Sequence, residues 1–258
     1  LEWAQQREAA VQRAVKSIER APETADTATY NAAMAGCRQL GRPADALTLW
    51  EQMRSAGVRP NPESYQHALV CAMRLQRHQL ALDVWQLLDE DASSTPTVLE
   101  YTAAISACER AGDPGRGLSL FDAMQAAGVT PDSNTMHVAV VAAGRAGEPQ
   151  RAADILARIE LLGARPPTEL YNEAAAACVR RGDWQLASQL LSRMHRHGIA
   201  RNSRTYRSVV VACEAGGDSA RSKLLAAVDQ LLQEPPGRVA AWTKDTALCD
   251  AAFAACAA

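Results

Sequence analysis

Apolar residues recur along most of the chain at the spacing of an amphipathic helix. One such apolar stripe consists of Ala46, Leu47, Leu49, Trp50 and Met53. These stretches are bounded by glycine, which ends a helix, or by proline, which cannot continue one. No stretch alternates apolar and polar residues in the manner of a half-buried strand. The pattern therefore predicts an all-α protein.

The predicted helices come in pairs that repeat about every 35 residues. All five tyrosines of the chain occupy one position of this repeat: Tyr30, Tyr65, Tyr101, Tyr171 and Tyr206. Met136 occupies the same position in the repeat that has no tyrosine. A glycine follows the first helix of most repeats: Gly41, Gly112, Gly147, Gly182 and Gly217. Self-similarity of this kind indicates a solenoid of helical hairpins, each of which buries its apolar faces against its neighbours.

The tyrosine position sets the predicted boundaries of the repeats. Counted from three residues before it, the repeats are 27–61, 62–97, 98–132, 133–167, 168–202 and a longer 203–245 with an insertion at 234–245. Residues 1–26 are predicted to be an N-terminal cap or the end of a preceding repeat, and residues 246–258 the first helix of a truncated repeat. The predicted fold is an α–α superhelical solenoid of tandem 35-residue hairpins.

Composition narrows the chemistry that this solenoid can perform. The net charge of -2 gives no global attraction to nucleic acid, so affinity for it requires a local basic stripe. Five of the seven cysteines share one position of the repeat, Cys37, Cys108, Cys178, Cys213 and Cys256. This recurrence favours packing in the core over a disulfide or a metal site. No apolar run is long enough to predict a membrane span.

The repeats resemble those of the pentatricopeptide repeat family. The resemblance covers residues 27–258 and is carried in the first repeat by Thr29-Tyr30-Asn31, Leu40-Gly41-Arg42 and Gly57-Val58-Arg59-Pro60-Asn61. The uniform repeat length is similar to that of P-type members, and Ser106-Ala107-Cys108-Glu109 is similar to first helices of algal and dinoflagellate members. The resemblance implies sequence-selective binding of single-stranded RNA, about one base per repeat, in a plastid or mitochondrion. No targeting segment is visible in this fragment, which begins at Leu1.

The resemblance also implies which residues recognise bases, since the fifth and last residues of a repeat face the base edge in this family. Asn31 with Asn61, and Asn172 with Asn202, are similar to pairs that favour pyrimidines, especially cytosine. Thr102 with Asp132 is similar to a pair that favours guanine. Three pairs depart from the family's pattern: Gln66 with Thr97, His137 with Pro167, and Arg207 with Asp245.

Two further positions bear on RNA binding. The family's second position normally carries an aliphatic residue that packs against a base, and here it holds Ala28, Glu63, Leu99, Asn134, Glu169 and Arg204. Near the end of four consecutive first helices stand Arg74, Arg110, Arg145 and Arg180, where the family often has a lysine for the phosphate backbone. We interpret these arginines as a local basic track for RNA phosphates. The alternative is that they are solvated cations, which helix C-termini favour.

Catalytic signatures are missing from the sequence. The zinc deaminase signature requires Cys-x-x-Cys, which does not occur, and no phosphate-cradling glycine-rich motif is present. The sequence therefore predicts a non-enzymatic RNA-binding solenoid that acts with other RNA-processing proteins in organelle RNA processing, stability or translation. We expect no cofactor, metal, membrane or small-molecule substrate. Two alternatives stay open: a protein–protein scaffold of the same architecture, and the recognition half of an enzyme with a catalytic domain beyond residue 258.

Overall fold

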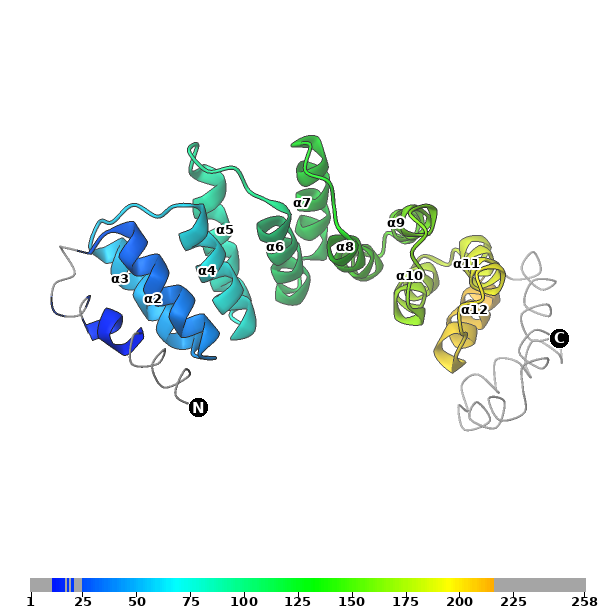
Figure 1. Ribbon diagram of the computed structural model, residues 1–258. Coiled ribbons are helices and arrows are strands. Elements are labelled where there is room, and N and C mark those ends of the chain that lie inside the picture. The colour runs from blue at the N-terminus through cyan, green and yellow to red at the C-terminus, as the bar shows by residue number, and fades with distance from the viewer. Residues whose placement is uncertain (1–10, 17, 19, 21–24, 216–258) are drawn as a thin grey trace. The chain divides into compact units, whose positions relative to one another are not determined.

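The computed structural model describes residues 11–16, 18, 20 and 25–215 (Figure 1). Beyond residue 25 this part of the chain consists of eleven α-helices joined by short turns, with no strand among them. In chain order they are α2 (Thr27–Gln39), α3 (Pro43–Ser55), α4 (Pro62–Arg74), α5 (His78–Glu90), α6 (Val98–Ala111), α7 (Pro114–Ala126), α8 (Ser133–Ala146), α9 (Pro149–Leu161), α10 (Thr168–Arg181), α11 (Trp184–Arg196) and α12 (Ser203–Ala215). The predicted all-α class is confirmed.

Each repeat from 27–61 to 168–202 contains two of these helices, so the even-numbered helices are first helices and the odd-numbered ones second helices. Among the described residues, no helix combines the length and apolarity needed to cross a membrane. The insertion predicted at 234–245, the truncated repeat 246–258, Cys256 and Asp245 lie outside the described residues, as does most of the predicted N-terminal cap.

The ends of the helices follow from local sequence. The residue before a first helix caps it in most repeats: Asn61 Oδ1 accepts a hydrogen bond from the backbone N–H of Ser64 at 3.0 Å, and Asp132 Oδ1 accepts one from Thr135 at 2.7 Å. Gly112 ends α6 in the left-handed region, with φ of 87°, which a residue with a Cβ adopts only under strain. The last residue of one repeat is therefore the N-cap of the next repeat's first helix.

The chain forms two compact parts, Leu1–Thr130 and Pro131–Ala258. In the N-terminal part, α4 packs against α2, α3, α5 and α6, and α6 packs against α7 (Figure 1). Two of the repeated tyrosines pack against a tryptophan of the preceding second helix. The ring centroids of Trp50 and Tyr65 are 5.5 Å apart, and those of Trp85 and Tyr101 are 4.8 Å apart. This contact joins successive hairpins, and all five repeated tyrosines are buried in the core.

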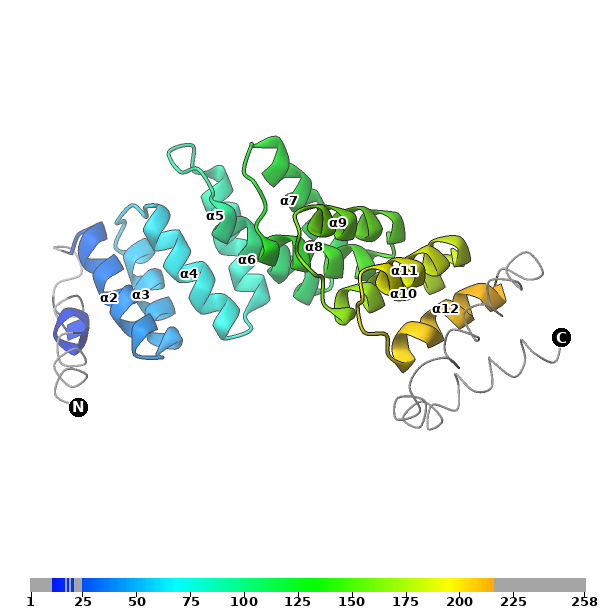
Figure 2. The same cartoon turned by 45° about the vertical axis from the view of Figure 1, so that its right-hand side comes forward.

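The C-terminal part has the same layering, in which α10 packs against α8, α9, α11 and α12 (Figure 2). Tyr171 and Tyr206 are fully buried in it. The buried Gly144 of α8 lies so close to the backbone of Glu173 in α10 that an added Cβ would be 3.0 Å from the Glu173 carbonyl oxygen. The missing Cβ of Gly144 thus lets α8 and α10 approach closely.

The repeated cysteines lie in the core, as their small apolar side chains predict. Cys37, Cys71, Cys108, Cys178 and Cys213 are all buried free thiols. Burial raises the pKa of each of them, to about 12 for Cys178. These side chains are therefore inert packing residues, because only the thiolate is nucleophilic.

Candidate nucleic-acid interface

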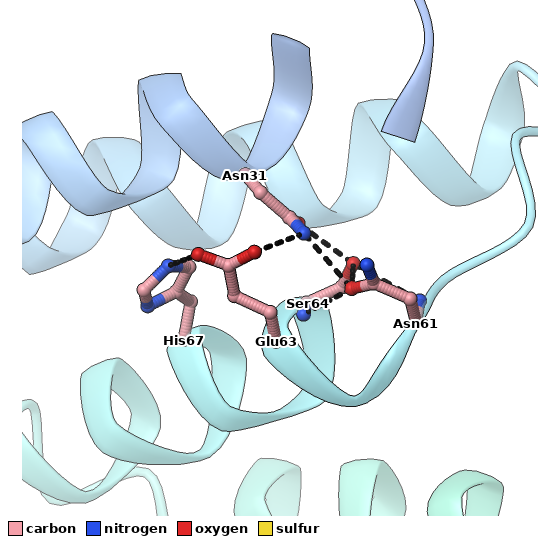
Figure 3. Close-up of polar contacts among 5 residues, drawn as sticks. All are labelled: Asn31, Asn61, Glu63, Ser64 and His67. Atoms are coloured by element: carbon pink, nitrogen blue, oxygen red, sulfur yellow. Dashed lines mark hydrogen bonds and ion pairs between the residues drawn. The ribbon is translucent and has the colours of Figure 1, made fainter. Parts of the chain in front are cut away.

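The first predicted base-recognition pair, Asn31 and Asn61, belongs to a connected network of hydrogen bonds between α2 and the start of α4 (Figure 3). Asn31 Nδ2 donates to Asn61 Oδ1 at 2.8 Å and to Glu63 Oε2 at 3.2 Å. The Ser64 hydroxyl donates to Asn31 Oδ1 at 2.7 Å. The structure thus brings the predicted pair together, with Asn31 2% exposed and Asn61 exposed.

The C-terminal part repeats most of this network, with Thr205 in place of Ser64. Asn172 Nδ2 donates to Asn202 Oδ1 at 3.2 Å, and the Thr205 hydroxyl donates to Asn172 Oδ1 at 2.7 Å. Asn202 caps α12 by accepting from the Thr205 backbone N–H at 3.0 Å. Asn172 is 2% exposed and Asn202 is exposed, as in the first network. The hydrogen bonds between the two asparagines and the hydroxyl residue are therefore the same in both compact parts.

The other predicted pairs lie in less uniform surroundings. Thr102 is buried and its hydroxyl donates to Val98 O of its own helix at 2.7 Å. Asp132 is exposed and belongs to the other compact part. For the remaining positions, Gln66 and His137 are half-buried, whereas Thr97, Pro167 and Arg207 are exposed.

The second residues of the repeats are all exposed: Ala28, Glu63, Leu99, Asn134, Glu169 and Arg204. Leu99 is one of the few large apolar residues exposed among the described ones, at 42%. Two charged second residues contact the preceding repeat. Glu63 reaches Asn31, as described above, and Arg204 Nη2 forms an ion pair with Glu173 Oε1 at 2.9 Å. The second position is thus a solvent-facing position beside the fifth and last residues.

His67, one helical turn after Glu63, completes the network in the N-terminal part (Figure 3). Its Nε2 lies 3.6 Å from Glu63 Oε1, and the side chain is buried. Burial lowers the pKa of His67, the charge of Arg38 acts in the same direction, and Glu63 acts against both. Sequence reasoning missed the roles of Ser64, Thr205 and His67. The recurrence of a hydroxyl residue three positions after an N-cap asparagine was the available signal for the first two.

The four arginines of the predicted phosphate track, Arg74, Arg110, Arg145 and Arg180, all lie exposed in the last turn of a first helix. Two of them donate to a backbone carbonyl near the end of the preceding first helix. Arg74 Nη1 bonds Arg38 O at 3.3 Å, and Arg180 Nη2 bonds Gly144 O. These bonds link neighbouring hairpins and satisfy helix C-termini. A guanidinium has five N–H donors, so one such bond leaves capacity for other acceptors.

The described residues hold no group of three histidine, cysteine, aspartate or glutamate side chains placed to bind one metal ion. The polar groups of the interface are instead amides, hydroxyls, carboxylates and guanidinium groups. Groups of these types can form hydrogen bonds with base edges and ion pairs with phosphates.

Comparison with known proteins identifies the repeats. The family model described as "PPR repeat" matches residues 28–58, 101–129 and 170–199. A mitochondrial pentatricopeptide repeat-containing protein of Arabidopsis thaliana is 32% identical over 96 residues, which cover 37% of this chain and 15% of that protein. The three matched segments begin in α2, α6 and α10, in phase with the predicted repeats.

Solved structures share the fold. The pentatricopeptide repeat protein PPR10 of maize, in complex with an 18-nt psaJ RNA element, superposes with a TM-score of 0.62 at 20% identity, covering 96% of this chain and 42% of its own. The nuclear proteinaceous RNase P 2 of Arabidopsis thaliana gives a TM-score of 0.59 at 11% identity, with coverage of 71% and 41%. This chain thus spans less than half of either solved chain. From its matched repeats, its in-phase helical hairpins and its relative in Arabidopsis, the chain contains pentatricopeptide repeats.

Proposed function

We propose that this protein binds single-stranded RNA along the first helices of its repeats, without catalysing a reaction. The observation that carries the proposal is a polar surface that recurs with the repeat. The second residues and the last residues are exposed at the start of the first helices, and arginines are exposed at their ends. The crystal structure of PPR10 with an RNA element supports RNA as the ligand of a solenoid with this fold.

Helix geometry supports a shared role for the second residue and the arginine. In four repeats they are eleven residues apart: Glu63 and Arg74, Leu99 and Arg110, Asn134 and Arg145, Glu169 and Arg180. Eleven residues make about three turns, so both side chains lie on one face of the helix, about 16 Å apart. Each of these first helices therefore offers a base-reading position and a cation on one face.

The amide pair supports a preference for bases whose edges accept hydrogen bonds. Asn202 Oδ1 already accepts from Asn172 and from Thr205, and Asn172 Oδ1 accepts from Thr205. The Asn202 Nδ2 group has no acceptor among the described residues. The pair therefore offers donors, and cytosine presents two adjacent acceptors, N3 and O2, on its Watson–Crick edge. This is the physical basis for the pyrimidine preference that we propose for Asn172 and Asn202.

A salt titration tests RNA binding. We would measure the affinity of a fluorescent pool of single-stranded RNA at several salt concentrations, for the wild type and for Arg110→Gln and Arg180→Gln. Each substitution should weaken binding to all sequences alike and reduce the slope of log K against log salt by about 0.7. Arg54→Gln and Arg196→Gln are matched controls, because these exposed arginines lie on second helices. An equal effect of the controls contradicts the phosphate track.

We further propose that the protein acts with other RNA-processing proteins in a mitochondrion or plastid. The mitochondrial relative supports an organelle, and imaging of the tagged full-length gene product tests it. A protein-binding scaffold is the second candidate, favoured by the charged second residues Glu63 and Glu169, which do not suit stacking against a base. Absence of RNA binding even at low salt would leave the scaffold as the better explanation.

A further inference from the structure

Two of the repeats carry the same base-recognition pair, but the structure surrounds the two pairs differently. We infer that Glu63 closes the buried Asn31 amide to base recognition, while the equivalent Asn172 amide stays available. The inference rests on the proposed RNA binding and assigns a specificity-determining role to the residue that follows the pair by two positions. It predicts that two repeats with identical pairs differ in the base selectivity they impose.

The hydrogen bonds of the two buried amides carry this inference. An asparagine amide has two N–H donors and one carbonyl acceptor. In Asn31, one N–H bonds Asn61 Oδ1, the other bonds Glu63 Oε2, and the carbonyl accepts from Ser64 (Figure 3). In Asn172, one N–H bonds Asn202 Oδ1 and the carbonyl accepts from Thr205. Its second N–H has no acceptor among the described residues. Only Asn172 therefore retains a donor for a ligand.

The cause of the difference is the second residue of the following repeat. Glu63 is a carboxylate, which accepts from Asn31, whereas the equivalent Arg204 is a guanidinium, which cannot accept. Arg204 turns instead to Glu173 and pairs with it at 2.9 Å. The identical pairs are thus distinguished by one side chain outside them.

The Glu63 carboxylate contacts two buried side chains, Asn31 and His67. One carboxylate oxygen lies 3.2 Å from Asn31 Nδ2 and the other 3.6 Å from Nε2 of the buried His67. The Glu63 side chain is 58% exposed, so it lies between the buried Asn31 amide and solvent. A base that approaches Asn31 must displace this carboxylate. Its negative charge also repels the acceptor atoms and phosphates that the neighbouring donors attract.

Selection from a randomised single-stranded RNA pool, followed by sequencing of the bound fraction, tests the inference on the full chain. The wild-type motif should contain a pyrimidine position that depends on Asn172 and none that depends on Asn31. Glu63→Val removes the acceptor and should add one pyrimidine-selective position, with about fivefold to tenfold discrimination, the value of one hydrogen bond. Glu63→Gln keeps an acceptor for Asn31 and should leave the motif unchanged.

Glu169→Val is the matched control, since Glu169 occupies the same exposed position but follows a repeat whose fifth residue is His137. It removes the same charge and should add no pyrimidine position. The inference is wrong if Asn31→Ala removes a selective position from the wild-type motif, or if Glu63→Val binds RNA with an unchanged motif. If the wild type binds no RNA at all, the proposed function itself fails. Far-UV circular dichroism of each variant establishes that it is folded.

Discussion

Removal of the Ser64 hydroxyl should measurably lower the free energy of unfolding, because this fully buried group links two repeats by hydrogen bonds. It donates to Asn31 Oδ1 at 2.7 Å and accepts from the backbone N–H of Asn61 at 3.1 Å. Ser64→Ala deletes only this oxygen and leaves the cap of α4 in place, since Asn61 Oδ1 still accepts from the backbone N–H of residue 64. The substitution therefore isolates the contact between the repeats.

The expected magnitude follows from which groups lose a partner. Asn31 is 2% exposed, so its carbonyl oxygen is left buried without that donor, at a cost of about 1–3 kcal/mol. Asn61 is exposed, so water replaces the acceptor of its N–H. The higher helix propensity of alanine offsets about 0.5 kcal/mol. Ser64→Ala should therefore lower the free energy of unfolding by about 0.5–2.5 kcal/mol, the difference between these contributions.

Urea unfolding followed by circular dichroism and tryptophan fluorescence measures this change, since Trp50 and Trp85 lie in the same compact part. Ser119→Ala is the control. Ser119 is exposed in α7 and its hydroxyl bonds only Gly115 O of its own helix, at 3.2 Å. This variant should stay within about 0.5 kcal/mol of the wild type. The reasoning is refuted if Ser64→Ala costs no more than Ser119→Ala.

Three further predictions concern packing, thiol reactivity and pH. Gly144→Ala should lower the free energy of unfolding by about 1–2 kcal/mol, because the new Cβ would meet the backbone of Glu173 at 3.0 Å and α8 must move away from α10. Cys178 should resist alkylation by iodoacetamide in the folded protein, since burial raises its pKa to about 12. Lowering the pH should destabilise the protein through His67. Burial depresses the folded-state pKa of His67 below the ordinary 6.5. The neutral His67 side chain therefore contributes fully to the free energy of unfolding above pH 6.5, and this contribution is lost as the pH falls below that value.

Each of these predictions has its own control. Gly115→Ala adds a Cβ with no close neighbour in the first turn of α7 and should not destabilise, so equal urea midpoints for the two glycine variants would contradict the packing argument. Peptide mass spectrometry should find Cys178 alkylated in urea but not in buffer; rapid labelling in buffer contradicts its burial. His67→Gln should flatten the stability profile below about pH 6.5, and an unchanged slope would exclude His67 as its origin.

The fold followed from sequence because its signals are local and repeated. Glycines such as Gly112 end helices through their own backbone geometry, and a period of apolar residues predicts a helical face whatever it packs against. The tyrosine period predicted the phase of the hairpins, and the structure adds the partner of one of these tyrosines, the contact of Tyr65 with Trp50. That contact joins residues of different helices, so only the recurrence of the tyrosines was visible in the sequence.

The candidate interface was less predictable because it depends on side-chain directions between helices. The fifth and last residues were expected to lie together, and the structure places Asn31 against Asn61. It also buries Asn31 and brings Glu63 to it, which no residue-by-residue pattern indicates. The contacts of the four arginines were also not predictable from the sequence. Their common position was clear from sequence, but the bond of Arg74 to the carbonyl of Arg38 depends on how closely two helices pack.

The N-cap role of the last residue restricts how such a solenoid can change its ligand. Asn61, Asp132 and Asn202 each hold the start of a helix through a side-chain oxygen, and the same residues are the proposed partners of a base. Residues that cap helices well are asparagine, aspartate, serine and threonine, which are also short side chains with hydrogen-bonding groups for a base edge. A change among these four can alter selectivity while the helix keeps its cap. A change outside this set removes the side-chain cap together with the group for the base, as at Pro167, which precedes α10 without a side-chain cap.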